Sequence, residues 1–206
     1  MITTASPHPN SPHPNPPDPR AQEEYQVRFD WGLDGLHSIA PGADVVVIVD
    51  VLPGSTPGAD RLVARVPKET QAVLGAGLTN RRAVAGWIRA RQAETQGRFT
   101  VSIVAVGEPV AAGPDAAGVR FSVEDHFAAG ALVDALADTG IDYHSPEAAA
   151  ACASFTALRG GLRQLIRASG AGRALIAQGG VDLLEQATRL DESQDVPILA
   201  EWDDRF

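Results

Sequence analysis

Two runs of β-branched residues constrain the fold of this chain more than any other feature. Residues 45–49 read Val-Val-Val-Ile-Val, and residues 101–106 are apolar apart from Ser102. Near-continuous apolar runs of this length are typical of strands covered on both faces, as in a parallel sheet between helices. We therefore expect an α/β fold, a three-layer domain with a mostly parallel sheet flanked by helices.

The rest of the chain alternates between strand and helix patterns. Polar and apolar residues alternate over 25–31, which predicts a half-buried edge strand. The apolar run at 71–78 does not distinguish strand from helix, and we favour a strand because Asn80 can then cap a clear helix. The other expected elements are a helical turn at 33–39, short strands at 62–66 and 196–199, helices at 81–93, 123–138, 146–159, 161–168 and 173–178, and an unassigned segment at 181–190.

The amino-terminal end differs in composition from the remainder. Residues 1–22 hold seven of the fifteen prolines and show no apolar periodicity. Such a segment is expected to be a disordered or polyproline-like tail. Residues 23–206 then form a single domain with a sizeable core, since a chain of this length suits one domain plus a tail.

Charge and composition limit the partners of the protein. The formal net charge is −9 with dispersed arginines, so we expect no nucleic-acid partner, because an acidic chain repels a phosphate backbone. No stretch approaches the roughly 20 apolar residues of a membrane span, and the tail lacks the pattern of a secretion signal. A single cysteine, Cys152, excludes an intrachain disulfide. We expect a cytoplasmic protein without a membrane partner, and homo-oligomerisation is left open.

Carboxylates follow both buried strands and begin the next helix. Asp50 comes directly after the first run, Glu108 follows the second, and Glu124 and Asp125 open the helix at 123–138. Ligands of parallel sheets bind outside the carboxyl ends of the strands. Acidic side chains that converge there suit a hard cation such as Mg2+, and with it phosphate chemistry. These four residues are the predicted metal ligands.

Each carboxylate also has a structural interpretation. Asp50 can start a turn, and Glu108 can be an exposed loop residue. Ser122 and Asp125 have the form of a capping box, in which acidic residues of a first helical turn are favoured without any function. Neighbouring helical residues diverge by about 100°, so one of Glu124 and Asp125 can cap the helix while the other points into the cleft.

Two further features lie near these carboxylates. Gly54, Ser55 and Thr56 offer a flexible backbone and two hydroxyls, which suit phosphate oxygens, although an ordinary turn has the same composition. His126 is a candidate general acid or base, and a partly exposed helical histidine is the simpler interpretation. Small residues at 128–131 are expected to let the helix lie close against the sheet.

From residue 29 onward the chain resembles the 2-phosphosulfolactate phosphatase family, the Mg2+-dependent ComB-like phosphatases. The most specific pieces are the strand end at 50–52 and the helix start at 124–131, and the order of the pieces carries more weight than any one. The matching pieces are 28–32, 46–52, 72–87, 124–131 and 183–199. The resemblance implies an α/β fold, Mg2+ and hydrolysis of (2R)-2-phospho-3-sulfolactate to sulfolactate and phosphate.

The resemblance also implies roles for single residues. Asp50, Glu124 and Asp125 are the predicted catalytic residues, and they bind Mg2+ together with Glu108. The attacking group is expected to be a metal-activated water, and the expected partner is a small phosphorylated acid as substrate. The predicted substrate-binding residues are Gly54, Ser55, Thr56, Asn80 and Arg81.

The chain departs from the family pattern at one place. Pro53 and Gly54 follow the first strand end where family members continue with a Thr-rich segment, and a central stretch with an arginine is shortened. Two hypotheses therefore stay open: a Mg2+-dependent phosphatase acting on a small phosphomonoester, and a truncated, non-catalytic homologue that binds an anionic ligand or partner. An unrelated α/β binding domain is a third.

Overall fold

The sheet is mostly parallel, as the sequence predicts. The computed structural model describes residues 18–52, 58–95, 97–110 and 118–202. Within these residues a five-stranded sheet has the order β1-β4-β2-β3-β7. The four parallel strands are β1 (Val27–Trp31), β4 (Val101–Ala105), β2 (Val45–Val49) and β3 (Ala72–Ala76), and β7 (Ile198–Glu201) pairs antiparallel with β3. Strand β1 lies at the edge as predicted, but residues 27–29 are all buried rather than half-buried, and the run at 71–78 contains the strand β3.

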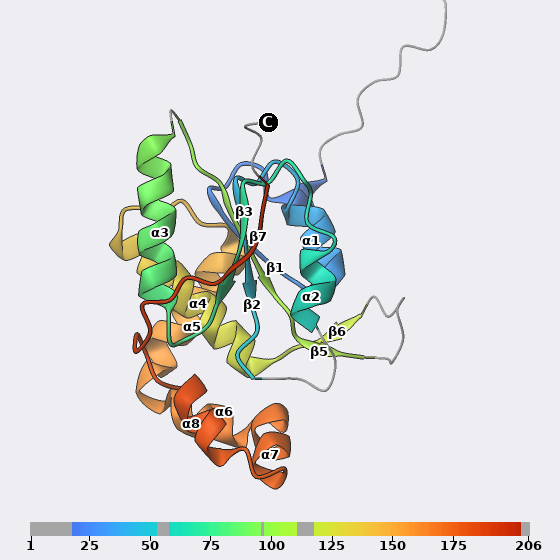
Figure 1. The fold of residues 1–206 in the computed structure, drawn as a ribbon, viewed down its shortest axis with the longest axis vertical. Coiled ribbons are helices and arrows are strands. Elements are labelled where there is room, and N and C mark those ends of the chain that lie inside the picture. Colours follow the sequence, from blue (N-terminus) through green and yellow to red (C-terminus); the bar gives the residue numbers. More distant parts are fainter. Residues whose placement is uncertain (1–17, 53–57, 96, 111–117, 203–206) are drawn as a thin grey trace, which may run out of the picture.

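Helices cover both faces of this sheet (Figure 1). On one face lie α3 (Arg81–Glu94), α4 (Val123–Asp138) and α5 (Pro146–Leu158), and on the other lie α1 (Gly32–Ile39) and α2 (Gly58–Val63). Successive residues of β2 point into opposite layers, so Val47 packs in the core with α3–α5 while Val46 packs with α1. Because both layers bury the strand, its sequence shows no alternation.

Three short helices lie beyond the carboxyl ends of the strands, below α4 and α5 in Figure 1. They are α6 (Leu162–Ala168), α7 (Gly170–Ala177) and α8 (Val181–Ala187). A 3-10 turn, Arg159–Gly161, separates α5 from α6. Two short strands, β5 (Glu108–Pro109) and β6 (Val119–Arg120), form a small antiparallel pair just after β4.

Several sequence predictions need correction. Residues 62–66 are not a strand: α2 ends at Val63, and the backbone N–H groups of residues 64–66 donate to carbonyls three or four residues earlier, as in helical turns. The last strand begins at Ile198 rather than at residue 196. Helix α7 begins at Gly170 rather than at residue 173, because Ser169 caps it by accepting a hydrogen bond from the backbone N–H of Gly172.

Helix α4 contacts β2, β3 and β4, as its small residues predict, and Gly130 also packs closely against α5. A Cβ on Gly130 would collide with the carbonyl group of Ala151 in α5. Close helix–helix packing, and not closeness to the sheet alone, therefore requires glycine at this position.

Residues 18–22, which the composition places in the tail, contact the sheet. Pro19–Ala21 form a 3-10 helix, and the buried Gln22 side chain both accepts from and donates to the backbone of Phe29 at 3.0 Å. Residues 1–17 lie outside the described part of the chain.

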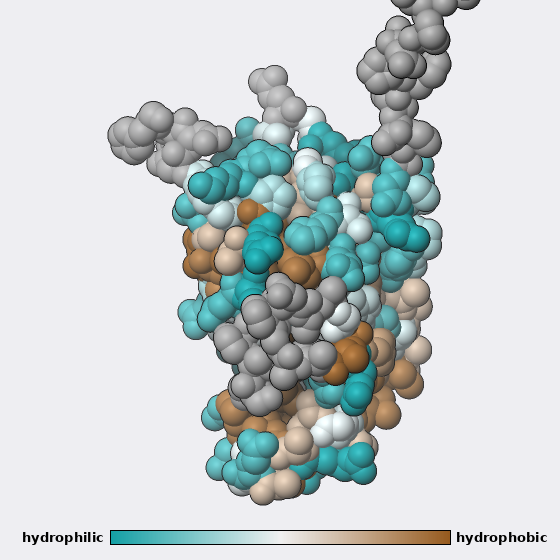
Figure 2. Space-filling model, turned by 90° about the vertical axis from the view of Figure 1, so that its right-hand side faces the viewer, coloured by the Kyte–Doolittle hydropathy of each residue, from teal (hydrophilic) through white to brown (hydrophobic). Residues whose placement is uncertain are grey.

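The surface over α1 and α2 is mixed. On the face shown in Figure 2, hydrophilic side chains cover most of the upper part and hydrophobic side chains form small groups among them. Within the described residues, no helix has the length and apolar character required to cross a membrane.

Candidate functional site

Three of the four predicted acidic residues meet at the carboxyl ends of β2 and β4. Asp50 follows β2, and Glu124 and Asp125 lie in the first turn of α4. Desolvation and the charge of Glu124 raise the pKa of Asp50 to about 6. Desolvation, with the charges of Asp50 and Glu124, raises the pKa of Asp125 to about 7 against two backbone hydrogen bonds that lower it. The three carboxylates are thus close enough to repel one another.

These carboxylates differ in accessibility. Asp50 remains exposed to solvent, although surrounding protein atoms desolvate it in part, whereas Glu124 and Asp125 are each 3% exposed. Oε2 of Glu124 has no hydrogen-bond partner among the described residues. A buried carboxylate oxygen without a donor is costly unless a cation or water satisfies it.

The carboxylate of Asp125 contacts two loops. Its Oδ1 accepts a hydrogen bond from the backbone N–H of Val51 at 2.9 Å, and its Oδ2 accepts one from Gly107 at 3.0 Å. The backbone N–H of Asp125 donates to Oγ of Ser122 at 3.3 Å, which confirms half of the predicted capping box. In the other half of a capping box the acidic side chain would accept from the backbone N–H of Ser122. Here the Asp125 side chain instead accepts from the loops after β2 and β4.

The acidic group fits a magnesium ion in its donor chemistry. Mg2+ is commonly bound by one or two carboxylates together with water and substrate phosphate oxygens. Accessible Asp50 and the unpartnered oxygen of Glu124 provide two such ligands. Across the described residues, no three acidic, histidine or cysteine side chains are arranged to hold an ion by themselves. A magnesium ion bound here would therefore need further oxygen ligands from water or substrate.

Glu108 lies apart from this group, at the rim. It belongs to β5, and its Oε2 is 3.8 Å from Nη1 of Arg120 on the partner strand β6. Glu108 is not among the charges that raise the pKa of Asp50 or Asp125, and its metal-binding role stays a prediction. The sequence prediction did not single out Arg120, because an isolated arginine carries no pattern.

The predicted substrate-binding residues fall into two groups. Gly54, Ser55 and Thr56 lie outside the described residues. Asn80 precedes α3 but does not cap it: its Oδ1 accepts from the backbone N–H of Gly77 at 2.9 Å. Its Nδ2 donates to two backbone carbonyls, those of residues 75 and 195. Asn80 therefore shapes the loop after β3.

Arg81 is buried and engaged with neighbouring elements. Its guanidinium pairs with Asp134 of α4 at 2.7 Å and with Asp191 at 3.1 Å. These contacts give Arg81 a structural role, and its contact with substrate, like that of Asn80, stays a prediction.

A cavity of about 400 Å3 opens beside Asp50. It is lined by the loop after β3, residues 75–80, and by Ala187, Pro197 and Leu199 from the carboxyl-terminal part of the chain. A volume in this range suits a small organic ligand. The cavity adjoins Asp50 of the acidic group at the carboxyl ends of the strands, which is where ligands of parallel sheets bind.

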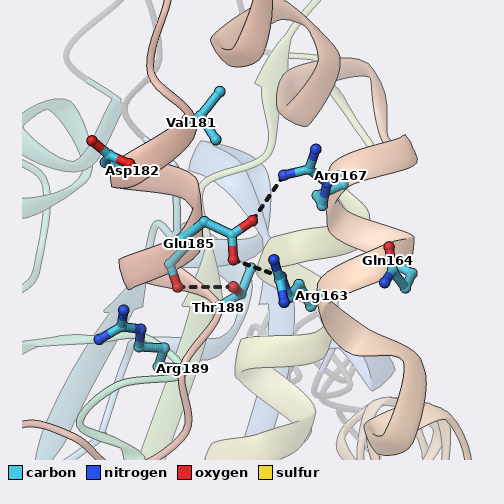
Figure 3. A pocket seen from close by; sticks show the side chains of 8 residues that line it. All are labelled: Arg163, Gln164, Arg167, Val181, Asp182, Glu185, Thr188 and Arg189. Carbon is cyan, nitrogen blue, oxygen red and sulfur yellow. Dashed lines mark hydrogen bonds and ion pairs between the residues drawn. The ribbon is translucent and has the colours of Figure 1, made fainter.

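A larger cavity, of about 790 Å3, lies between α6 and α8 (Figure 3). Arg163 and Arg167 both point to the carboxylate of Glu185, and Arg189 is turned away from it. Since these ion pairs join the two helices and none of the three interacting carboxylates lines this cavity, we place the candidate site at the smaller one.

His126 faces aromatic side chains. The rings of Phe29, Trp31 and Phe121 lie 5.1–6.1 Å from its ring. Its Nε2 is 3.3 Å from Oγ of Ser154, and that hydroxyl donates to a backbone carbonyl, so Nε2 carries the proton. Burial lowers the pKa of His126. The structure thus favours a neutral packing residue over an acid–base catalyst.

Comparison with protein families gives a match over most of the chain. The family model described as 2-phosphosulpholactate phosphatase matches residues 54–201, which are 148 of the 206 residues. The match contains Glu108, Glu124 and Asp125, whereas Asp50 and the pieces at 28–32 and 46–52 precede it. No curated protein matches the chain.

Proposed function

Because the chain belongs to the 2-phosphosulpholactate phosphatase family, we propose that it is a Mg2+-dependent phosphatase that hydrolyses 2-phospho-3-sulfolactate or a related small phosphomonoester. One observation carries this proposal. The accessible Asp50 lines a cavity of about 400 Å3, and it lies within the electrostatic influence of Glu124, which keeps one buried oxygen without a partner. Two oxygen ligands and space for a small acid are what such a reaction requires.

Asp50 and Glu124 are the proposed Mg2+ ligands. A bound Mg2+ supplies positive charge that offsets the phosphoryl oxygens during hydrolysis. In their ionised forms the two side chains would hold the ion at the carboxyl ends of β2 and β4. The loop at 75–80 encloses the organic part of the substrate and limits its exposure to water.

Arg120 is the proposed ligand for a second anionic group of the substrate. A substrate with several negative charges needs fixed cationic donors in an acidic site. The Arg120 side chain is 72% exposed, and its contact with Glu108 is long at 3.8 Å. It can therefore exchange that contact for a carboxylate or sulfonate. Its backbone lies beside Gly107, whose N–H binds Asp125.

A non-catalytic homologue is the second candidate function. It is favoured by the two-residue ligand set and by a family match that begins after Asp50. Such a protein binds an anion at the same cavity without turnover.

Phosphate release separates the two functions. The assay uses 2-phospho-3-sulfolactate and an aryl phosphate, with Mg2+ or with EDTA. We expect Mg2+-dependent release, and a loss of about 100-fold or more in kcat/KM for Asp50→Asn and Glu124→Gln. Glu147→Gln is the matched control, because Glu147 also lies in the first turn of a helix capped by serine but is exposed. Substrate binding by calorimetry without phosphate release identifies the non-catalytic homologue.

A further inference from the structure

Asp125 lies among the site carboxylates, but both of its oxygens are already occupied. Val51 donates to Oδ1 and Gly107 donates to Oδ2, and the residue is 3% exposed. Glu124, its neighbour in α4, is equally buried but keeps one oxygen without a partner. The carboxylates of these two adjacent residues therefore differ: Asp125 accepts backbone hydrogen bonds at both oxygens, whereas Glu124 has one oxygen without a partner.

The two donors of Asp125 lie where β2 and β4 separate. These strands pair in parallel up to Val49 and Ala105, and one further backbone bond joins Val106 to Val49 at 2.9 Å. Beyond this point the ladder ends. Asp125 then links the two departing chains through Val51 and Gly107.

The backbone at Gly107 is shaped for this contact. Its φ is +66°, which favours glycine, and a Cβ there would approach the carbonyl oxygen of Arg120 to 2.9 Å. Another side chain at Gly107 would shift the turn that directs its N–H toward Asp125.

We infer that Asp125 is a positioning residue and not a metal ligand: its carboxylate fixes the loop after β2 so that Asp50 faces Glu124. The inference deepens the proposed function and rests on it for the role of the Asp50–Glu124 pair. Val51 directly follows Asp50, so the bond at Oδ1 sets the backbone that carries Asp50. The same turn of α4 then offers the open oxygen of Glu124 beside it.

The chain contains a matched control at the opposite, amino ends of the same strands. Asp44, just before β2, accepts from the backbone N–H of Thr100 at 2.7 Å and from the Gln71 side chain at 3.1 Å. It links the amino ends of β2 and β4 as Asp125 links their carboxyl ends. Asp44→Asn therefore makes the same side-chain change at the opposite ends of these strands.

The test compares Asp125→Asn with Asp44→Asn in the full chain. Asparagine has one acceptor oxygen and an NH2 group, so it cannot accept from both amides. In metal-free protein we expect amide hydrogen exchange at Val51 and Gly107 to be about tenfold faster in Asp125→Asn, with Thr100 unchanged. Asp44→Asn is expected to leave exchange at Val51 and Gly107 unchanged, because its side chain contacts Thr100 and Gln71 at the amino ends of the strands. Unchanged exchange at Val51 and Gly107 in Asp125→Asn overturns the inference.

Binding and turnover complete the test. We expect Asp125→Asn to bind Mn2+ within about threefold of wild type while kcat falls about 10- to 100-fold with KM little changed. Loss of tenfold or more in Mn2+ affinity makes Asp125 a ligand, and an equal loss of kcat in both variants makes its role merely structural. Either result overturns the inference.

A conservative variant guards against misfolding. Asp125→Glu keeps both acceptor oxygens, and we expect it to restore part of the protection at Val51 and Gly107 and part of kcat. Absence of any such rescue contradicts the inference. If wild-type protein releases no phosphate, the proposed phosphatase function fails, whereas amide exchange and Mn2+ affinity still decide the positioning of Asp50.

Discussion

Nη1 of Arg81 lies 2.7 Å from Oδ2 of Asp134, and this ion pair joins the first residue of α3 to α4. The same guanidinium donates to the carbonyl of Ala131, pairs with Asp191 and lies over the ring of Phe155, 5.1 Å from its centroid. Arg81 thus connects three helices and the segment that precedes β7.

Replacing Arg81 tests this role. Arg81→Gln leaves Asp134, whose side chain is 24% exposed, without its partner, and breaking this partly buried pair is expected to cost about 2–3 kcal/mol of unfolding free energy. Arg82→Gln is the control, because Arg82 also pairs with Asp191 but its side chain is 63% exposed, and such pairs contribute about 1 kcal/mol or less. Urea denaturation measures the free energy of unfolding of both variants. Equal losses of this free energy in the two variants would contradict a structural role for Arg81.

Stability of the metal-free protein is expected to fall as the pH rises. The pKa values of Asp50 and Asp125 are raised from 3.8 to about 6 and about 7. The folded state therefore holds these protons more tightly than the unfolded chain. This stabilisation is fully present below pH 3.8 and is lost as the pH passes 6 and 7. Asp125 contributes more, because solvent screens the accessible Asp50.

Urea denaturation in EDTA from pH 5 to pH 8 measures this dependence. We expect the free energy of unfolding of Asp50→Asn to fall less steeply with pH, because one titrating group and its repulsion of Asp125 are removed. Added Mg2+ is expected to stabilise the wild type more at pH 8 than at pH 5, because ion binding needs ionised carboxylates. A free energy of unfolding that rises from pH 5 to pH 8 would contradict the raised pKa values of Asp50 and Asp125.

The contact between α4 and α5 predicts an asymmetric pair of glycine substitutions. Gly130→Ala places a Cβ against the carbonyl of Ala151, and overpacking of this kind costs about 1–3 kcal/mol. Gly86→Ala in α3 meets no atom within 4 Å, and alanine in an exposed helix interior is expected to stabilise by about 0.5–1 kcal/mol. Thermal unfolding of the two variants checks the opposite signs.

The proposed role of Arg120 predicts a selective change in KM. Arg120→Gln is expected to raise KM about tenfold for 2-phospho-3-sulfolactate, since a charge-assisted hydrogen bond contributes roughly 1.4 kcal/mol or more. An aryl phosphate, which lacks the second anionic group, should be affected little. Arg98→Gln is the control. It removes the same charge, and Arg98 lies before β4, at the amino ends of the strands. Equal effects on both substrates would exclude this role.

Local patterns were sufficient for the layers of the fold. The runs at 45–49 and 101–106 are buried on both faces as their composition predicts, and Ser122 caps α4 where a capping residue is expected. The error at 62–66 arose because a short apolar run has no period long enough to separate strand from helix.

The sequence alone determined that acidic side chains follow the strands, because each strand end and the start of α4 are encoded within a few residues. Only the tertiary structure decided what each carboxylate does. Asp125 meets a backbone N–H 74 residues away, and Arg81 meets a carboxylate 53 residues away. Such contacts depend on where separate elements end relative to one another, and no local periodicity records that distance. Burial then distinguishes Asp125, which is engaged, from Glu124, which keeps an open oxygen.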